Sequence, residues 1–98
     1  MTFDLFKATL VDDAPPLEIA PVLRALWVEA RGDWDGAHKI VQDMSDRSAA
    51  WVHAYLHRKE GDLTNAAYWY SRAGRDLSAF SLEREWEEIV KTLLASSV

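Results

Sequence analysis

The chain has 98 residues, of which 49% are hydrophobic and 28% are charged, and this composition is typical of one folded domain. Five tryptophans, three tyrosines and three phenylalanines supply a large apolar surface, so a stable core requires neither disulfides nor metal. The net charge of −5 argues against general nucleic-acid binding, which needs a basic surface. The absence of cysteine excludes a disulfide framework and a thiolate zinc site.

The N-terminal segment, residues 1–16, carries no basic region followed by an apolar one, so we expect no signal peptide. No apolar run in the sequence is long enough for a membrane span, and a cytoplasmic location is the default expectation. Phe3, Phe6 and Leu10 favour a short helix that docks on the core. The alternative is a partly disordered segment.

The first strongly periodic stretch follows Pro15-Pro16, because proline suits the first turn of a helix. Apolar residues then recur at three- and four-residue spacing: Ile19, Val22, Leu23, Leu26, Trp27 and Ala30. Gly32 ends this predicted helix, since glycine adopts the left-handed cap conformation without a Cβ penalty. Asp33 can cap the next helix by accepting hydrogen bonds from its free N–H groups.

The Gly-Asp pair recurs 29 residues later as Gly61-Asp62, and the helices after the two pairs share one apolar spacing. The matching residues are Ala37, Ile40, Val41 and Met44 in the first helix and Ala66, Trp69, Tyr70 and Ala73 in the second. Ser45 or Asp46 can cap the helix between them. Residues 17–45 and 46–75 are therefore predicted to be two copies of one helical hairpin.

A last helix is predicted within residues 78–96, where Ser81 is a candidate cap. Its apolar stripe consists of Leu82, Trp86, Ile89, Val90, Leu93 and Leu94, and its charged face of Glu83, Arg84, Glu85, Glu87, Glu88 and Lys91. The charged run is interpreted as a solvated face. The predicted fold class is all-α: one domain, residues 1–98, with two antiparallel helical hairpins and a C-terminal capping helix.

The two turn-and-helix segments resemble tetratricopeptide repeats, in which a Gly-Asp-aromatic turn precedes small and large residues at this spacing. Residues 65–74 are also similar to the second helix of Sel-one-like repeats. The resemblance covers about residues 18–75. It implies an α-solenoid and a protein-binding role, with the first helices lining an inner groove.

The chain departs from this family in repeat length and copy number. The repeat of 29 residues is shorter than the usual ~34. In the first helices, the family's large apolar and aromatic positions fall on Arg24 and Val28, and on His53 and His57. Two units are fewer than the usual three, so terminal helices or a second copy of the chain must cover the exposed faces.

The most unusual segment, residues 51–60, supplies the candidate binding residues. The family pattern places four of them on the inner groove: Trp51, Tyr55, Arg58 and Lys59. This chemistry suits a peptide or helix ending in a carboxylate, because aromatic rings provide contact area and cations hold the negative end. The alternative is that Trp51 and Tyr55 are core residues and the cations are solvated.

His53 and His57 complete the candidate set, and their four-residue spacing places them on one helical face. Metal ligation would require a third ligand, and Glu60 or His38 would have to reach the pair through the fold. The alternative is a partly buried pair of structural histidines. The sequence itself predicts no metal ligand set and no cofactor.

The favoured function is a non-catalytic module that binds an unknown protein or peptide. The sequence has no cysteine nucleophile and no glycine-rich phosphate loop, so we do not expect an enzyme. One alternative is a structural homodimer in which Trp27, Trp34 or Trp86 pair across a two-fold interface. A second alternative is a small metal protein or enzyme centred on the two histidines.

Overall fold

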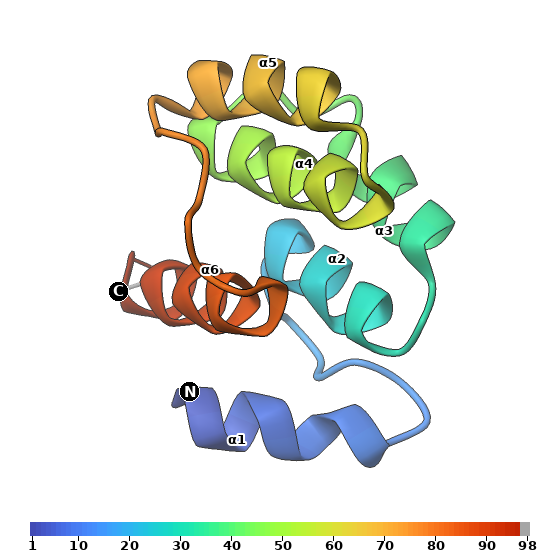
Figure 1. The fold of residues 1–98 in the computed structure, drawn as a ribbon. Coiled ribbons are helices and arrows are strands. Elements are labelled where there is room, and N and C mark those ends of the chain that lie inside the picture. Colours follow the sequence, from blue (N-terminus) through green and yellow to red (C-terminus); the bar gives the residue numbers. More distant parts are fainter. Residues whose placement is uncertain (97–98) are drawn as a thin grey trace.

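The computed structural model describes residues 1–96, and over this range the protein contains helices and no strand. The all-α prediction is therefore confirmed for the described chain. The elements are α1 (Phe3–Ala8), the 3₁₀ helix η1 (Thr9–Val11), α2 (Pro21–Ala30), α3 (Trp34–Val41), α4 (Arg47–Glu60), α5 (Leu63–Ala73) and α6 (Leu82–Ser96) (Figure 1). None of these helices is long and apolar enough to cross a membrane.

Two helical pairs form the centre of the molecule: α2 packs on α3, and α4 packs on α5. The turn within each pair contains the predicted Gly-Asp sequence. Gly32 and Gly61 have φ angles of 93° and 92°, which place both in the left-handed region. The side chains of Asp33 and Asp62 each accept a hydrogen bond from the backbone N–H three residues later. The predicted signals for ending one helix and starting the next are confirmed in both pairs.

Replacing Gly61 with valine is expected to lower the free energy of unfolding by about 1 kcal/mol or more. A Cβ at this position meets no atom within 4 Å, so the cost comes from the left-handed backbone and not from a clash. Chemical denaturation measures the change. Asparagine, which tolerates this conformation better, is the matched control and should cost less. Equal stability of the valine variant and the wild type would contradict the role of Gly61 as a cap.

One predicted helix boundary is wrong. The helix α2 begins at Pro21 and not directly after Pro15-Pro16, so Ile19 lies outside it. The residue before a proline avoids helical angles, and Ala20 is accordingly extended with φ −60° and ψ 148°. The helix α6 begins at Leu82, within the predicted residues 78–96. Ser81 caps it as predicted, because its hydroxyl accepts a hydrogen bond from the N–H of residue 84.

The N-terminal segment adopts the docked-helix alternative. Phe6 of α1 is completely buried. The rings of Phe3 and Phe6 both lie 6.0 Å from the ring of Trp86, centre to centre. The indole N–H of Trp27 also donates to Thr9 in η1, which ties this segment to the first helical pair.

The C-terminal helix α6 packs mainly on α4, α2 and α1. Figure 1 shows it alongside α2, with α4 on one side and α1 on the other. Its buried side chains include Trp86, Ile89, Val90 and Leu93. The helix thus covers the first helices of both pairs, which is the side where the family resemblance places an inner groove.

Candidate functional site

The six candidate residues lie on two different sides of α4. Four of them, Trp51, Tyr55, Arg58 and Lys59, form what we call the α4 inner face, which contacts α2 and α6. The other two, His53 and His57, contact α3 and α5 through aromatic rings. The helix therefore supports two separate sites.

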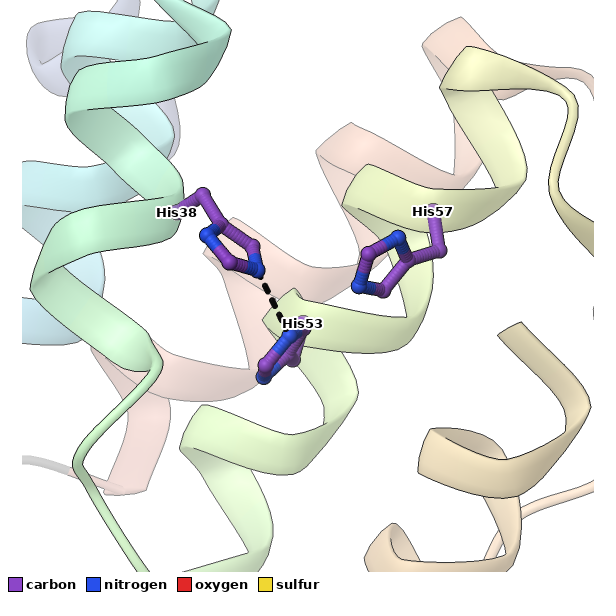
Figure 2. A group of neighbouring side chains, drawn as sticks. All are labelled: His38, His53 and His57. Carbon is purple, nitrogen blue, oxygen red and sulfur yellow. Dashed lines mark hydrogen bonds between the residues drawn. The ribbon is translucent and has the colours of Figure 1, made fainter. Parts of the chain in front are cut away.

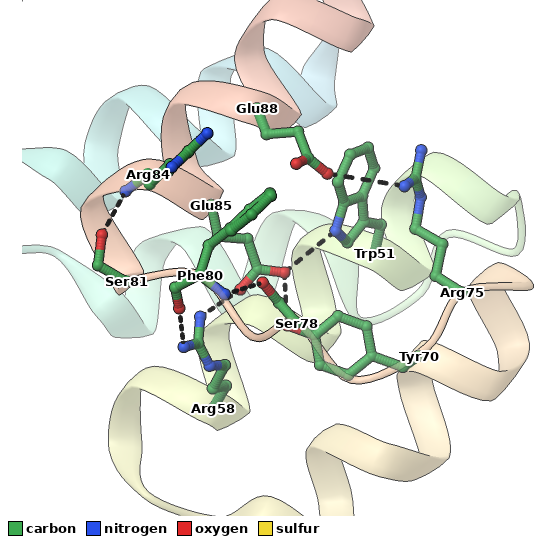
Figure 3. A network of polar contacts seen from close by, with 10 residues as sticks. All are labelled: Trp51, Arg58, Tyr70, Arg75, Ser78, Phe80, Ser81, Arg84, Glu85 and Glu88. Atoms are coloured by element: carbon green, nitrogen blue, oxygen red, sulfur yellow. Dashed lines mark hydrogen bonds and ion pairs between the residues drawn. The ribbon is translucent and has the colours of Figure 1, made fainter.

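The first site is built around Glu85 of α6, whose side chain is 1% exposed. Its Oε2 accepts hydrogen bonds from Trp51 Nε1, at 3.2 Å, and from the Tyr70 hydroxyl. Its Oε1 accepts from Arg58 Nη1 at 2.8 Å. Figure 3 shows the three donors converging on this carboxylate, and we call the four residues the Glu85 site. A buried charge is tolerated only with such partners, so the site fixes the register of α6 on α4.

Two further contacts strengthen the Glu85 site. Arg58 also donates to the backbone carbonyl of Phe80, just before α6 begins. The guanidinium of Arg75 lies over the ring of Trp51, with 3.4 Å between the guanidinium carbon and the ring centre. Burial and the hydrogen bond to Glu85 raise the pKa of Tyr70 well above its usual value, so the hydroxyl remains a donor.

The other end of the α4 inner face borders α2. Lys59 forms an ion pair with Glu29 of α2, which is 3% exposed. Tyr55 and Lys59 line a cavity of about 360 Å³ together with Trp86 of α6. Burial, followed by the charges of Glu29 and Glu85, raises the pKa of Tyr55 above its usual value. The tyrosine is therefore neutral beside two carboxylates.

The structure buries the two aromatic residues of the α4 inner face and leaves Lys59 exposed. Trp51 and Tyr55 are 4% and 2% exposed, as the core alternative expects. Arg58 and Lys59 are nevertheless not simply solvated, since each forms an ion pair with a buried glutamate. The carboxylate held on this face is the side chain of Glu85 from the chain's own α6, whereas the sequence led us to expect the end of a separate peptide or helix, which stays a prediction.

The second site is a cluster of the only three histidines in the sequence, His38, His53 and His57. His38 reaches the pair from α3, as one of the two third ligands considered from the sequence. Figure 2 shows the three rings turned toward one another between α3 and α4. The Nε2 atoms of His38 and His53 are 3.0 Å apart. We call these three residues the histidine cluster.

Aromatic and acidic neighbours fix the rings of the histidine cluster. Trp34 stacks on His38 at 5.0 Å between ring centres, and Trp69 stacks on His53 at 3.8 Å. Glu60, the other third ligand considered, instead accepts a hydrogen bond from Nδ1 of His57 at 2.6 Å. Rigid rings with defined orientations are the arrangement that metal ligation requires.

The histidine cluster also favours neutral imidazoles. Burial, followed by the neighbouring His38 and His57, lowers the pKa of His53 to about 4. Burial and His57 also lower the pKa of His38, against a smaller opposing effect of nearby acids. At neutral pH these two rings are therefore uncharged.

The tryptophans proposed for a dimer interface are engaged within the chain. Trp27 and Trp86 are 4% and 8% exposed, and Trp34 is partly buried. The indole N–H of Trp86 donates to the carbonyl of Leu26, and that of Trp34 donates to the carbonyl of Leu56. Trp27 and Trp86 therefore expose little surface for pairing, and a homodimer through these rings stays a prediction.

Sequence reasoning missed Glu85 and Tyr70 as members of a site. Glu85 was assigned to the solvated face of the last helix, and that assignment is wrong. A signal was present, because Glu85 stands three residues after Leu82 and four before Ile89, on the apolar stripe. A charged residue within an apolar stripe indicates a buried ion pair.

Comparison with known proteins found no matching protein family, no similar curated protein and no similar solved structure. The functional argument therefore rests on the geometry of the two sites.

Proposed function

We propose that this protein is a non-catalytic interaction module, built on two tetratricopeptide-like units, that holds an acidic amphipathic helix. The observation that carries the proposal is the Glu85 site. Trp51 and Arg58 of α4 and Tyr70 of α5 together satisfy a helix-borne carboxylate. In the structure the bound helix is the chain's own α6.

The residues that hold this carboxylate belong to the repeat pair, whereas the carboxylate belongs to the terminal helix. Two units are too few to cover their own apolar faces, so a further helix is required. The α4 inner face meets this need with aromatic contact area and two cations. Such a surface recognises a helix by an apolar stripe that contains one glutamate.

The connection to α6 supports exchange of this helix between chains. Residues 75–81 contain no helix and join α5 to α6. Beside this connection lies a cavity of about 440 Å³, lined by Tyr70, Arg75, Phe80 and Glu85 among others. The segment is exposed over most of its length, so few contacts hold it to the core. A hinge of this kind is where terminal elements exchange between copies of a protein.

The partner that fits these features is the α6 helix of a second copy of the chain. Its Glu85 would occupy the same three donors in trans, and every contact of the Glu85 site would be retained. A dimer that exchanges α6 would be both an interaction module and a homodimer. Its interface would be the contact of α6 with the α4 inner face, and not the tryptophans considered from the sequence.

Binding of an α6 peptide tests the proposal. The acceptor is the full chain with Glu85→Ala, in which the intramolecular helix lacks its carboxylate. We expect a labelled peptide of residues 78–96 to bind this acceptor at least about tenfold more tightly than the same peptide carrying Glu85→Ala. Hydrogen bonds to a charged group contribute about 1.5–3 kcal/mol each, which is sufficient for such a ratio. Fluorescence anisotropy measures both affinities.

The acceptor Glu85→Gln, which keeps the side-chain volume, replaces the alanine variant if circular dichroism shows the latter to be unfolded. The matched control is a peptide with Glu88→Ala, because Glu88 is half-exposed and its nearest cation, on Arg75, is 3.8 Å away. This peptide should bind like the unmodified one. Equal binding of the unmodified and Glu85→Ala peptides would refute recognition through the Glu85 site.

A further inference from the structure

The three histidines lie at the distances expected of metal ligands. One nitrogen from each ring falls within 4.8 Å of the others, and the closest pair, in His38 and His53, is 3.0 Å apart. In a tetrahedral site with metal–nitrogen bonds of 2.0–2.1 Å, two ligand nitrogens are about 3.3 Å apart. Small rotations of the side chains are therefore enough to place all three nitrogens around one cation.

The hydrogen bond between His57 and Glu60 prepares one of these ligands. A carboxylate accepts hydrogen bonds, so the proton of the imidazole lies on Nδ1 and the lone pair lies on Nε2. Figure 2 shows the other ring nitrogen of His57 directed toward His38 and His53. A histidine held by a carboxylate in this way is the usual outer-sphere arrangement of a metal ligand.

The cluster is incomplete as a purely structural hydrogen-bonded group. Two imidazoles that face each other through Nε2 share a single proton between two acceptor atoms. Nδ1 of His53, the ring nitrogen that does not face His38, is also buried and has no hydrogen-bond partner. Buried polar groups kept for packing are normally satisfied. The nitrogens that converge at the centre of the cluster can serve one ligand that the protein atoms do not supply.

The packing of the rings also favours a cation. Stacking on Trp34 and Trp69 limits the rotation of the His38 and His53 rings, which lowers the entropy lost on ligation.

We infer that His38, His53 and His57 form a three-nitrogen site for one divalent transition-metal cation of the zinc class. Imidazole ligands suit Zn²⁺ and its late first-row neighbours, whereas Mg²⁺ and Ca²⁺ prefer oxygen ligands. Since this group contains three ligands, water or another small ligand completes a four-coordinate sphere. The cation connects α3 to α4 and so clamps the two helical pairs together. This site is independent of the Glu85 site and of the proposed helix binding.

Calorimetric titration of the full chain with Zn²⁺ tests the inference. We expect one bound ion per chain and a rise in melting temperature. Substitution of Co²⁺ should give the intense visible absorption of four-coordinate cobalt. The variant Glu60→Gln should weaken binding about tenfold through loss of the orienting carboxylate. His38→Ala, which alters the partly exposed ligand, should weaken binding by more than the roughly 100-fold that outer-sphere changes reach.

The matched control is Asp43→Asn, since Asp43 is an exposed acid just after the helix that carries His38 and is not one of the clustered groups. Its zinc affinity should equal that of the wild type. The inference is overturned if the wild type binds no Zn²⁺, if cobalt gives only the weak spectrum of six-coordinate ions, or if a folded His38→Ala binds zinc as the wild type does. The cobalt spectrum of the wild type decides the question even if the variants do not fold.

Discussion

Replacing Glu85 with alanine is expected to lower the free energy of unfolding by about 3–5 kcal/mol. The change leaves the Arg58 guanidinium without its partner, and it leaves the donors of Trp51 and Tyr70 unsatisfied in the core. Loss of one member of a buried ion pair is costly because the remaining charge keeps its desolvation penalty. Urea denaturation followed by circular dichroism measures the loss.

The neighbouring Glu88→Ala provides the control within the same helix. Its ion pair with Arg75 spans 3.8 Å between partly exposed side chains, and we expect a change of about 0.5 kcal/mol or less. Similar losses for the two variants would contradict the special position of Glu85. The difference between the two losses in free energy of unfolding gives the contribution of the buried site, apart from the general effect of removing a glutamate.

Acidification of the metal-free protein is expected to lower the free energy of unfolding by up to about 3 kcal/mol, through His53 alone. In the folded state burial lowers the pKa of this ring to about 4, whereas the unfolded chain has the ordinary value of 6.5. Between these two pH values the unfolded state binds more protons, so protonation favours unfolding. The loss begins near pH 6.5 and is complete near pH 4.

Equilibrium denaturation in the presence of a chelator, at several pH values from 7 to 5, measures how the free energy of unfolding changes with pH. This range lies above the pH at which most carboxylates titrate. His38 contributes in the same direction because burial also lowers its pKa. The variant His53→Phe keeps a ring to stack on Trp69 but cannot be protonated, so its stability should depend less on pH. Stability of the wild type that does not change from pH 7 to pH 5 would contradict the buried, neutral state of His53.

Local signals in the sequence determined where most helices start and end. Gly32 and Gly61 require positive φ, and Asp33 and Asp62 cap the following helices, because both effects act within a few residues. The boundary at Pro21 was also available, since proline restricts the residue before it. The earlier pair Pro15-Pro16 provided a similar signal and drew the predicted start too far toward the N-terminus.

The candidate residues were selected by side-chain type, whereas their surroundings could not be predicted. The sequence singled out residues 51–60 for their aromatic and cationic side chains, and both sites are built on this helix. The periodicity of apolar residues in a helix indicates which face is buried, but it does not indicate which other element covers that face. The cover provided by α6, and the role of Glu85 within it, arise from contacts across 15 or more residues of sequence.

The amino-acid sequence alone determined the all-α class, the repeated Gly-Asp turns and the spacing of His53 and His57, because each depends on interactions between residues near in the chain. Only the tertiary structure decided that α6 lies on the α4 inner face and that His38 meets the other two histidines. These outcomes depend on how amphipathic faces pair in space, and many pairings satisfy the same pattern of apolar residues. The free energy of packing the whole chain selects among them.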